Sequence, residues 1–143
     1  MRGPGQVSAN NRHPMQIRDF ESADLDGVHR LLVINGWAHR IPDAEHLQRI
    51  VRASQRNAVA LLDGEVVGFA RAITDGLSNG YLSMVVVAEA QRRQGVGKAL
   101  VQRITGSEPG ITWILRAGRQ GASEFFATLG FVASTDAMER LRR

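Results

Sequence analysis

The pattern that most restricts the fold lies between residues 82 and 117. An apolar run, LSMVVVA, is followed by the glycine-containing stretch QRRQGVG, by a helical pattern and by a second apolar run, ITWILRA. A strand, a helix and a neighbouring strand in this order predict a parallel crossover. The second run is apolar at nearly every position, so we expect a strand that is covered on both faces, in the middle of a mixed sheet.

The segments before this pattern predict a strand and two helices. Residues 16–20 alternate polar and apolar side chains, as a half-buried strand does. We expect Ser22 to cap a helix that continues to the break at Asn35 and Gly36, and a second, weaker helix at residues 43–54.

The remaining segments predict an antiparallel meander and a mixed C-terminal part. Asp63 and Gly64 separate two β-rich runs, which predicts a hairpin that continues into a strand at residues 81–88. A short helix closed by Gly130 is expected after the second apolar run, and the sequences FVAS and AMERL predict two closing strands.

Length and composition indicate a globular protein of one domain. The chain has 143 residues, of which 43% are hydrophobic and 22% charged. Residues 1–13 are rich in Gly, Pro, Asn and Ser, so we expect a flexible leader there and a single domain over residues 14–143.

The composition also excludes several kinds of site. The absence of cysteine rules out disulfides, thiolate metal sites and a cysteine nucleophile, and the four histidines are too dispersed to predict a metal site. No apolar run approaches the roughly 18 residues that span a bilayer. The N-terminus lacks the apolar core of a secretory signal. We therefore expect a cytoplasmic protein with no metal and no membrane partner.

The charge of the chain favours an anionic ligand. The formal net charge is +4 from 18 basic residues, and Lys98 is the single lysine. No stripe of arginines with interleaved aromatic residues is present, so we expect no nucleic-acid partner.

Gly95 and Gly97 stand directly before a predicted helix. The first turn of a helix has unpaired N–H groups and a positive dipole, and missing side chains let a phosphate approach the backbone. A P-loop requires Gly at position 92 and Ser or Thr at 99, where this chain has Arg92 and Ala99. The dinucleotide fingerprint requires Gly where Leu100 stands. A tight strand-to-helix turn with no ligand remains the alternative interpretation.

The motif R-x-x-G-x-G, from Arg92 to Gly97, follows an apolar strand and opens an amphipathic helix. Together with FFATLGF at residues 125–131 and the order of elements from Gln16 onward, it resembles the GNAT family of acyl-CoA-dependent N-acetyltransferases. This resemblance implies an α+β fold of the three-layer α/β type. Its central sheet would be mixed and mostly antiparallel, with six or seven strands flanked by about four helices.

The resemblance implies acetyl-CoA as cosubstrate. Its diphosphate would lie on the N–H groups from Arg93 to Lys98, and its pantetheine arm along the strand before the turn, where an N–H near Val85 or Val86 would polarise the thioester. The cofactor-binding residues implied are Val85, Val86, Val87, Arg92, Arg93, Gln94, Gly95, Val96, Gly97, Lys98 and Phe126.

The catalytic residues depart from the family pattern. Many relatives carry Tyr where this chain has Phe126, which donates no proton, and Asn where it has Arg119. Relatives that use a strand carboxylate as base place it where this chain has Tyr81, with Ser83 on the same side. Tyr81 and Ser83 are therefore the catalytic candidates, as acid or as groups that order a water; the alternative for Tyr81 is an aromatic that packs on the neighbouring strand.

By the same resemblance, four side chains border the acceptor pocket, and an acid among them would attract a cationic amine: His39, Asp43, Glu45 and Asp75.

The implied function is transfer of an acetyl group from acetyl-CoA to a primary amine of a small molecule or peptide, by direct attack in a ternary complex. The alternative is a non-catalytic module that binds acyl-CoA or CoA on the same fold. Many relatives pair as dimers, so the resemblance is compatible with a homodimer.

Overall fold

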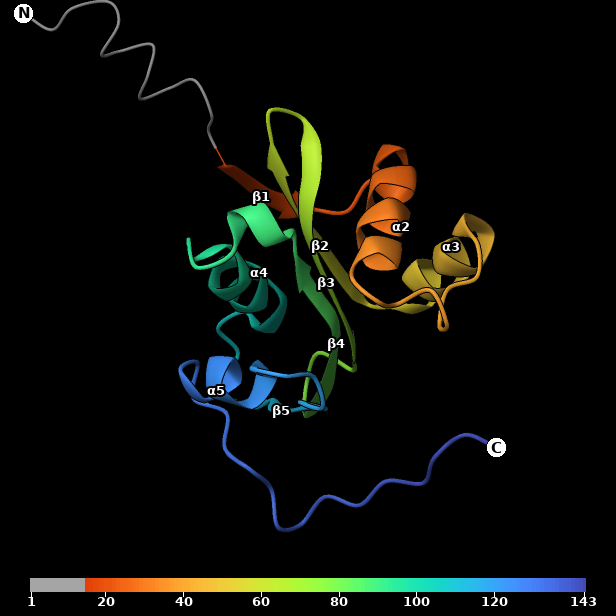
Figure 1. Ribbon diagram of the computed structural model, residues 1–143. Coiled ribbons are helices and arrows are strands. Elements are labelled where there is room, and N and C mark those ends of the chain that lie inside the picture. Colours follow the sequence, from red (N-terminus) through yellow and green to blue (C-terminus); the bar gives the residue numbers. More distant parts are fainter. Residues whose placement is uncertain (1–14) are drawn as a thin grey trace, which may run out of the picture.

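The structure is a computed structural model that describes residues 15–143, so the leader expected at residues 1–13 lies outside the described residues. Helices α2 and α3 cover one face of a five-stranded sheet, and α4 and α5 cover the other (Figure 1). The elements are β1 (Met15–Asp19), the 3₁₀ turn η1 (Ser22–Asp24), α2 (Leu25–Ile34), α3 (Ala44–Ala53), β2 (Arg56–Leu62), β3 (Glu65–Thr74), β4 (Asn79–Val87), the 3₁₀ turn η2 (Glu89–Gln91), α4 (Val96–Thr105), β5 (Thr112–Leu115) and α5 (Ala122–Ala127).

The strands follow chain order across the sheet. β1 to β4 form an antiparallel meander, and β5 pairs with β4 in parallel after the crossover through α4, which confirms the predicted topology. β5 is anchored by Trp113, whose ring packs over Gly80 of β4 and leaves no room for a Cβ atom there. The expected fold class, a mixed and mostly antiparallel sheet with four α-helices, is confirmed.

β5 differs from the expectation in place and in burial. It lies at the edge of the sheet instead of the middle, has four residues, and exposes alternate side chains, with Ile114 45% exposed. The apolar run therefore does not mark a strand that is covered on both faces. The outer edge of β5 has no neighbour among the described strands, and part of its outer face stays in contact with solvent.

The sheet has five strands rather than six or seven. Residues 131–134 and 137–141, expected as closing strands, form no strand and pair with no strand in the described part of the chain. Val132, Met138 and Leu141 are exposed. Alternation of apolar and polar residues stabilises a strand only where a neighbouring strand and a core receive it. The exposed apolar side chains of the tail have no core to cover them, and the edge of β5 beside which it could pair is only four residues long.

The two faces of the sheet carry separate cores. Phe69, Leu32 and Val59 belong to the core beneath α2 and α3, whereas Leu100 and Ile104 of α4 belong to the core on the other face. Gly68 of β3 allows α4 to approach closely, because a Cβ atom there would lie 2.8 Å from Leu100. None of the described helices is long and apolar enough to cross a bilayer.

The first helix begins differently from the prediction, and the second begins as expected. Ser22 does not cap α2; it starts the turn η1, which is held by the buried carboxylate of Asp24. Asp24 accepts the Glu21 N–H at 2.8 Å and both guanidinium nitrogens of Arg18 at 2.7 and 3.0 Å. The charged pair outcompetes a serine hydroxyl at this position. Asp43 caps α3 by accepting the His46 N–H at 2.8 Å.

A single carboxylate holds the β3–β4 turn, which sets where β4 begins. Asp75 accepts the N–H groups of Leu77, Ser78 and Asn79 at 2.9, 2.8 and 3.1 Å, and the Ser78 hydroxyl at 2.5 Å. Bonds from the Ser78 hydroxyl and from these backbone N–H groups hold the pKa of the Asp75 carboxyl well below its usual value.

We predict that Asp75→Ala lowers the melting temperature at pH 7, and that this difference narrows on acidification. The folded pKa is depressed, so the stabilisation is complete above the unfolded value, near 3.9, and is lost as the pH falls through the folded pKa. Thermal unfolding of both proteins from pH 7 down to pH 3 checks this, with the tail variant Asp136→Ala as control. A difference independent of pH contradicts it.

Candidate active site

Only the first half of β4 pairs with β5 along the edge that the two strands share. Pairing with β5 ends at Leu82 and Leu115, but β4 continues to Val87, and none of the strands within residues 15–143 lies beside it on that edge. A bulge bends β4 just past this point. Phe69 pairs with Val86 and Arg71 with Ser83, so two residues of β4 oppose one of β3, and Met84 has a φ of 54°. β4 and β5 therefore separate into an open wedge.

The two glycines of the turn serve different purposes. Gly95 has a φ of 82°, in the left-handed region that glycine adopts at little cost, and no side chain lies within 4 Å of its missing Cβ. Gly97 lies within α4, where a Cβ atom would come 3.0 Å from the ring of Phe125. One glycine sets the backbone turn, and the other lets α5 approach the start of α4.

The start of α4 presents free backbone donors. The first hydrogen bond of the helix runs from Ala99 N to Gly95 O at 3.0 Å. The N–H groups of Val96, Gly97 and Lys98 bond to no residue within 15–143. These donors point outward from the N-terminal end of the helix, where the dipole is positive.

The donors and the free edge of β4 border one cleft of about 800 Å³, here called the turn cleft. Phe125 and Phe126 of α5 close its far side. The sequence-predicted residues that line it are Val85, Val86, Val87, Arg92, Arg93, Gly95, Val96, Gly97, Lys98 and Phe126. Gln94, also predicted to bind the cofactor, does not line the turn cleft; its side-chain amide donates to Ala90 O at 3.4 Å instead.

Arg92 and Arg119 link the glycine turn and the segment before α5 to the C-terminal end of α2, around the turn cleft. Arg92 donates to Val87 O at 3.0 Å and to the Asn35 side chain at 2.7 Å. Arg119 donates to Asn35 O at 2.7 Å and stacks over Trp37 at 4.2 Å. Much of the hydrogen-bonding capacity of these two arginines is therefore used within the fold. Arg93 and Lys98, in contrast, form no ion pair with any residue that the structure describes.

Phe126 is both a core residue and a cleft residue. It is buried, and its ring meets those of Phe125 and Phe131 edge-on at 5.0 and 5.7 Å. Phe125 and Phe131 are partly buried and pack against the same core as Phe126.

A second cleft of about 380 Å³, the sheet-face cleft, lies between β4 and the loop that joins α2 to α3. Tyr81 and Ser83, the predicted catalytic residues, both line it. The two clefts adjoin each other, because five residues line both: Trp37, Val85, Arg119, Ala122 and Phe126. A molecule in one cleft can thus meet a molecule in the other at Val85.

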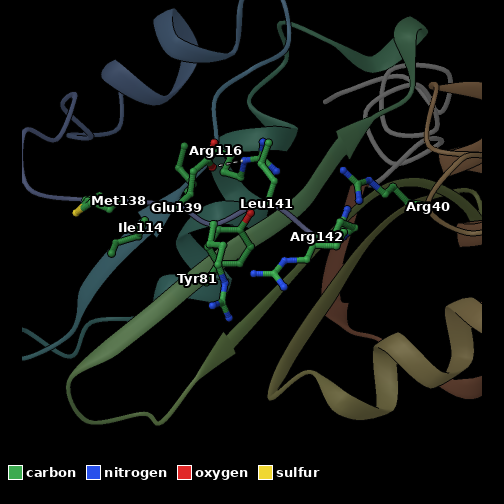
Figure 2. Close-up of a pocket in the computed structure, with 12 residues that line it drawn as sticks. Arg40, Tyr81, Ile114, Arg116, Met138, Glu139, Leu141 and Arg142 are labelled. Atoms are coloured by element: carbon green, nitrogen blue, oxygen red, sulfur yellow. Dashed lines mark ion pairs between the residues drawn. The ribbon is translucent and has the colours of Figure 1, made fainter.

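Tyr81 also belongs to a wider pocket of about 900 Å³ that the C-terminal tail covers. Figure 2 shows Tyr81 and Arg142 above the strands, with Arg40 at the far side of the pocket. Arg116 is ion-paired with Glu139 of the tail at 3.1 Å.

The acids expected at the acceptor pocket do not line the sheet-face cleft. Asp43 caps α3 and Asp75 holds the β3–β4 turn, so both carboxylates are occupied by backbone donors; Glu45 lies in the first turn of α3. Of the four expected residues only His39 lines the cleft. The residues described contain no group of three or more His, Cys, Asp or Glu arranged to hold a metal ion.

Sequence reasoning missed several cleft residues, among them Trp37, Arg40, Arg71, Phe125 and Arg142. Arg71 had a signal, since it is the one charged residue in the apolar run VVGFARAI. Its guanidinium is half-buried, and burial lowers its pKa, an effect that the nearby Tyr81 opposes. Trp37 lies in an irregular loop, where no periodicity marks a functional residue.

Comparisons with known proteins agree with this geometry. The family model "Acetyltransferase (GNAT) domain" matches residues 53–133. A GNAT-family acetyltransferase structure from Xanthomonas campestris is 27% identical, covers 90% of this chain and 94% of its own, and has a TM-score of 0.75. An acetyltransferase from Trypanosoma brucei is 26% identical, with 91% and 100% covered and a TM-score of 0.71.

A third structure is described as an aminoglycoside 6'-N-acetyltransferase complexed with coenzyme A. It is 26% identical, with 62% of this chain and 52% of its own covered, at a TM-score of 0.54. No curated protein matches the chain. The family model covers more than half of the residues and includes β4, the glycine turn and α5, and the chain therefore belongs to the GNAT acetyltransferase family.

Proposed function

We propose that the protein is an N-acetyltransferase that moves the acetyl group of acetyl-CoA to a primary amine of a small molecule or peptide, in a ternary complex. The observation that carries this proposal is that the free edge of β4 and the free N–H groups of α4 border the same cleft. One end of the cleft suits a diphosphate, and the other suits an extended amide-containing arm.

The turn cleft fits a diphosphate chemically. Val96, Gly97 and Lys98 offer three unpaired N–H donors at a helix N-terminus, and Arg93 and Lys98 add positive charge. The free edge of β4 from Val85 to Val87 offers backbone groups that would pair with the amides of a pantetheine arm as an added strand does, and the Val87 carbonyl oxygen there already accepts a bond from Arg92. The solved relative whose description includes coenzyme A supports this assignment.

The chemistry would take place where the two clefts meet. The amine nitrogen attacks the thioester carbonyl, a C–N bond forms, the C–S bond breaks, the amine loses a proton and the thiolate gains one. A backbone N–H near Val85 or Val86 would stabilise the oxyanion. Phe126 donates no proton, so we assign Tyr81 or Ser83 to the proton transfers, directly or through an ordered water.

The same phenylalanine favours a second candidate function. With Phe126 in place of a tyrosine, the chain would bind CoA or acyl-CoA without turnover. Release of free thiol from acetyl-CoA with a panel of amines separates the two: turnover with any amine supports the enzyme, whereas tight CoA binding with no thiol release supports the binding module.

We predict that Gly97→Glu abolishes CoA binding, because a carboxylate would occupy the diphosphate site and lie against Phe125. Isothermal calorimetry is expected to show a loss of at least about tenfold in affinity. Gly97→Ala separates the steric effect from the charge, and Gln102→Glu adds the same charge to α4 away from the cleft. Unchanged affinity in a folded Gly97→Glu variant refutes the assigned turn.

We predict that Tyr81→Phe lowers kcat by about 100-fold and removes one limb of the pH–rate profile, because the substitution deletes only the hydroxyl. Ser83→Ala, on the same side of β4, identifies which of the two hydroxyls handles the proton. An unaltered rate and pH profile in Tyr81→Phe would remove Tyr81 from the mechanism and leave the packing role.

A further inference from the structure

The sheet-face cleft is strongly basic. Its lining contains no Asp or Glu among the residues that the structure describes, and it contains His39 and five arginines: Arg40, Arg71, Arg116, Arg119 and Arg142. Two of the five already have partners within the fold: Arg116 forms an ion pair with Glu139, and Arg119 donates to the carbonyl oxygens of Asn35 and Gly36 at the end of α2. Three guanidinium charges therefore remain without an ion-pair partner within residues 15–143.

Arg71 is the most confined of the three. It projects from β3 opposite Ser83, and its Nη1 donates to the Ser54 hydroxyl at 3.0 Å. Its Nε is buried with no hydrogen-bond partner, and no described residue accepts a bond from its Nη2. A buried donor without an acceptor costs free energy. The Nε–Nη2 edge of a guanidinium matches the two oxygens of a carboxylate or phosphate.

We propose that the acceptor amine carries an anionic group, a carboxylate or a phosphate, which the guanidinium of Arg71 binds in the sheet-face cleft while Arg142 and Arg40 supply further positive charge. This inference rests on the proposed function and names its acceptor class. An anion at Arg71 places the rest of the acceptor beside Ser83, toward the junction of the two clefts at Val85.

The same charges act on the amine itself. Uncompensated cations nearby disfavour an ammonium ion relative to the neutral amine, and the neutral amine is the form that attacks a thioester. They also repel polycationic acceptors, for which no acid in the described lining compensates. An acceptor with one amine and one anionic group satisfies both conditions, because its anion is held while its amine loses a proton.

The test uses acceptor pairs that differ by the anionic group, with thiol release from acetyl-CoA as readout. L-phenylalanine is compared with phenethylamine for the carboxylate, O-phosphoethanolamine with ethanolamine for the phosphate, and kanamycin serves as a polycation. We expect kcat/KM to be about tenfold or more higher for at least one anionic member than for its partner. Equal or faster turnover of the partners that lack the anionic group, or faster turnover of kanamycin, overturns the inference and leaves the proposed function standing.

Variants locate the anion site. Arg71→Met is expected to raise KM for the anionic acceptor about tenfold while KM for acetyl-CoA stays the same, and Arg71→Lys to recover part of the loss. Arg142→Met, on the exposed tail, gives a smaller effect without risk to the fold, and Arg49→Met on the surface of α3 is the matched control. An equal rise in KM for the anionic acceptors and for the acceptors that lack the anionic group would overturn the assignment of Arg71.

If no acceptor releases thiol, the proposed function fails, and calorimetry of the same pairs against the CoA-loaded protein decides the inference by binding. Heat from the anionic members that disappears in Arg71→Met supports it. If neither member of any pair gives a heat of binding, or if only the members that lack the anionic group do, the inference is overturned.

Discussion

The end of strand pairing at Leu82 is the constraint on which the site depends. β5 stops at Leu115, and the bulge at Met84 bends β4 away from it, so the last residues of β4 keep backbone groups that no strand uses. Unpaired backbone groups inside a fold are costly unless solvent or a ligand satisfies them. The wedge between the two strands is thus a place where an extended ligand replaces a missing strand.

A set of hydrogen bonds around Asn35 holds the walls of this wedge. Arg92 comes from the glycine turn and Arg119 from the segment before α5, and both donate to Asn35 at the C-terminal end of α2. The last carbonyl groups of a helix lack partners within it, and cationic side chains are favoured there. The pairing of these arginines with α2 positions Trp37 beside Val85, where the two clefts meet.

The sequence predicted best what neighbouring residues determine. The hairpin at Asp63 and Gly64, the helix predicted at residues 43–54 and the helix after the glycine turn all depend on local geometry, and the structure has each of them. The parallel crossover was also predictable, because strand, helix and strand in this order permit few other topologies. Most of the predicted residues that line the turn cleft belong to the one segment from Val85 to Lys98, whereas Phe126 comes from α5. Gln94 does not line the cleft, because its side chain bonds back to its own turn.

The failures concern contacts between residues far apart in the chain. Whether ITWILRA is a central or an edge strand depends on what lies beyond it, and the tail that was expected there forms no strand. Asp75 was expected near an acceptor, but the turn beside it offers three N–H groups to its carboxylate. Arg71 enters the site because β3 pairs with β4 in a particular register, which no local pattern reveals.

Amide hydrogen exchange measured with and without acetyl-CoA tests the central claim most directly. The account predicts slower exchange on binding in two separate segments, Val85 to Val87 at the free edge of β4 and Val96 to Lys98 at the start of α4, with little change in β1 and β2. Exchange that is unaltered in both segments at saturating acetyl-CoA, or protection confined to other parts of the sheet, would contradict it.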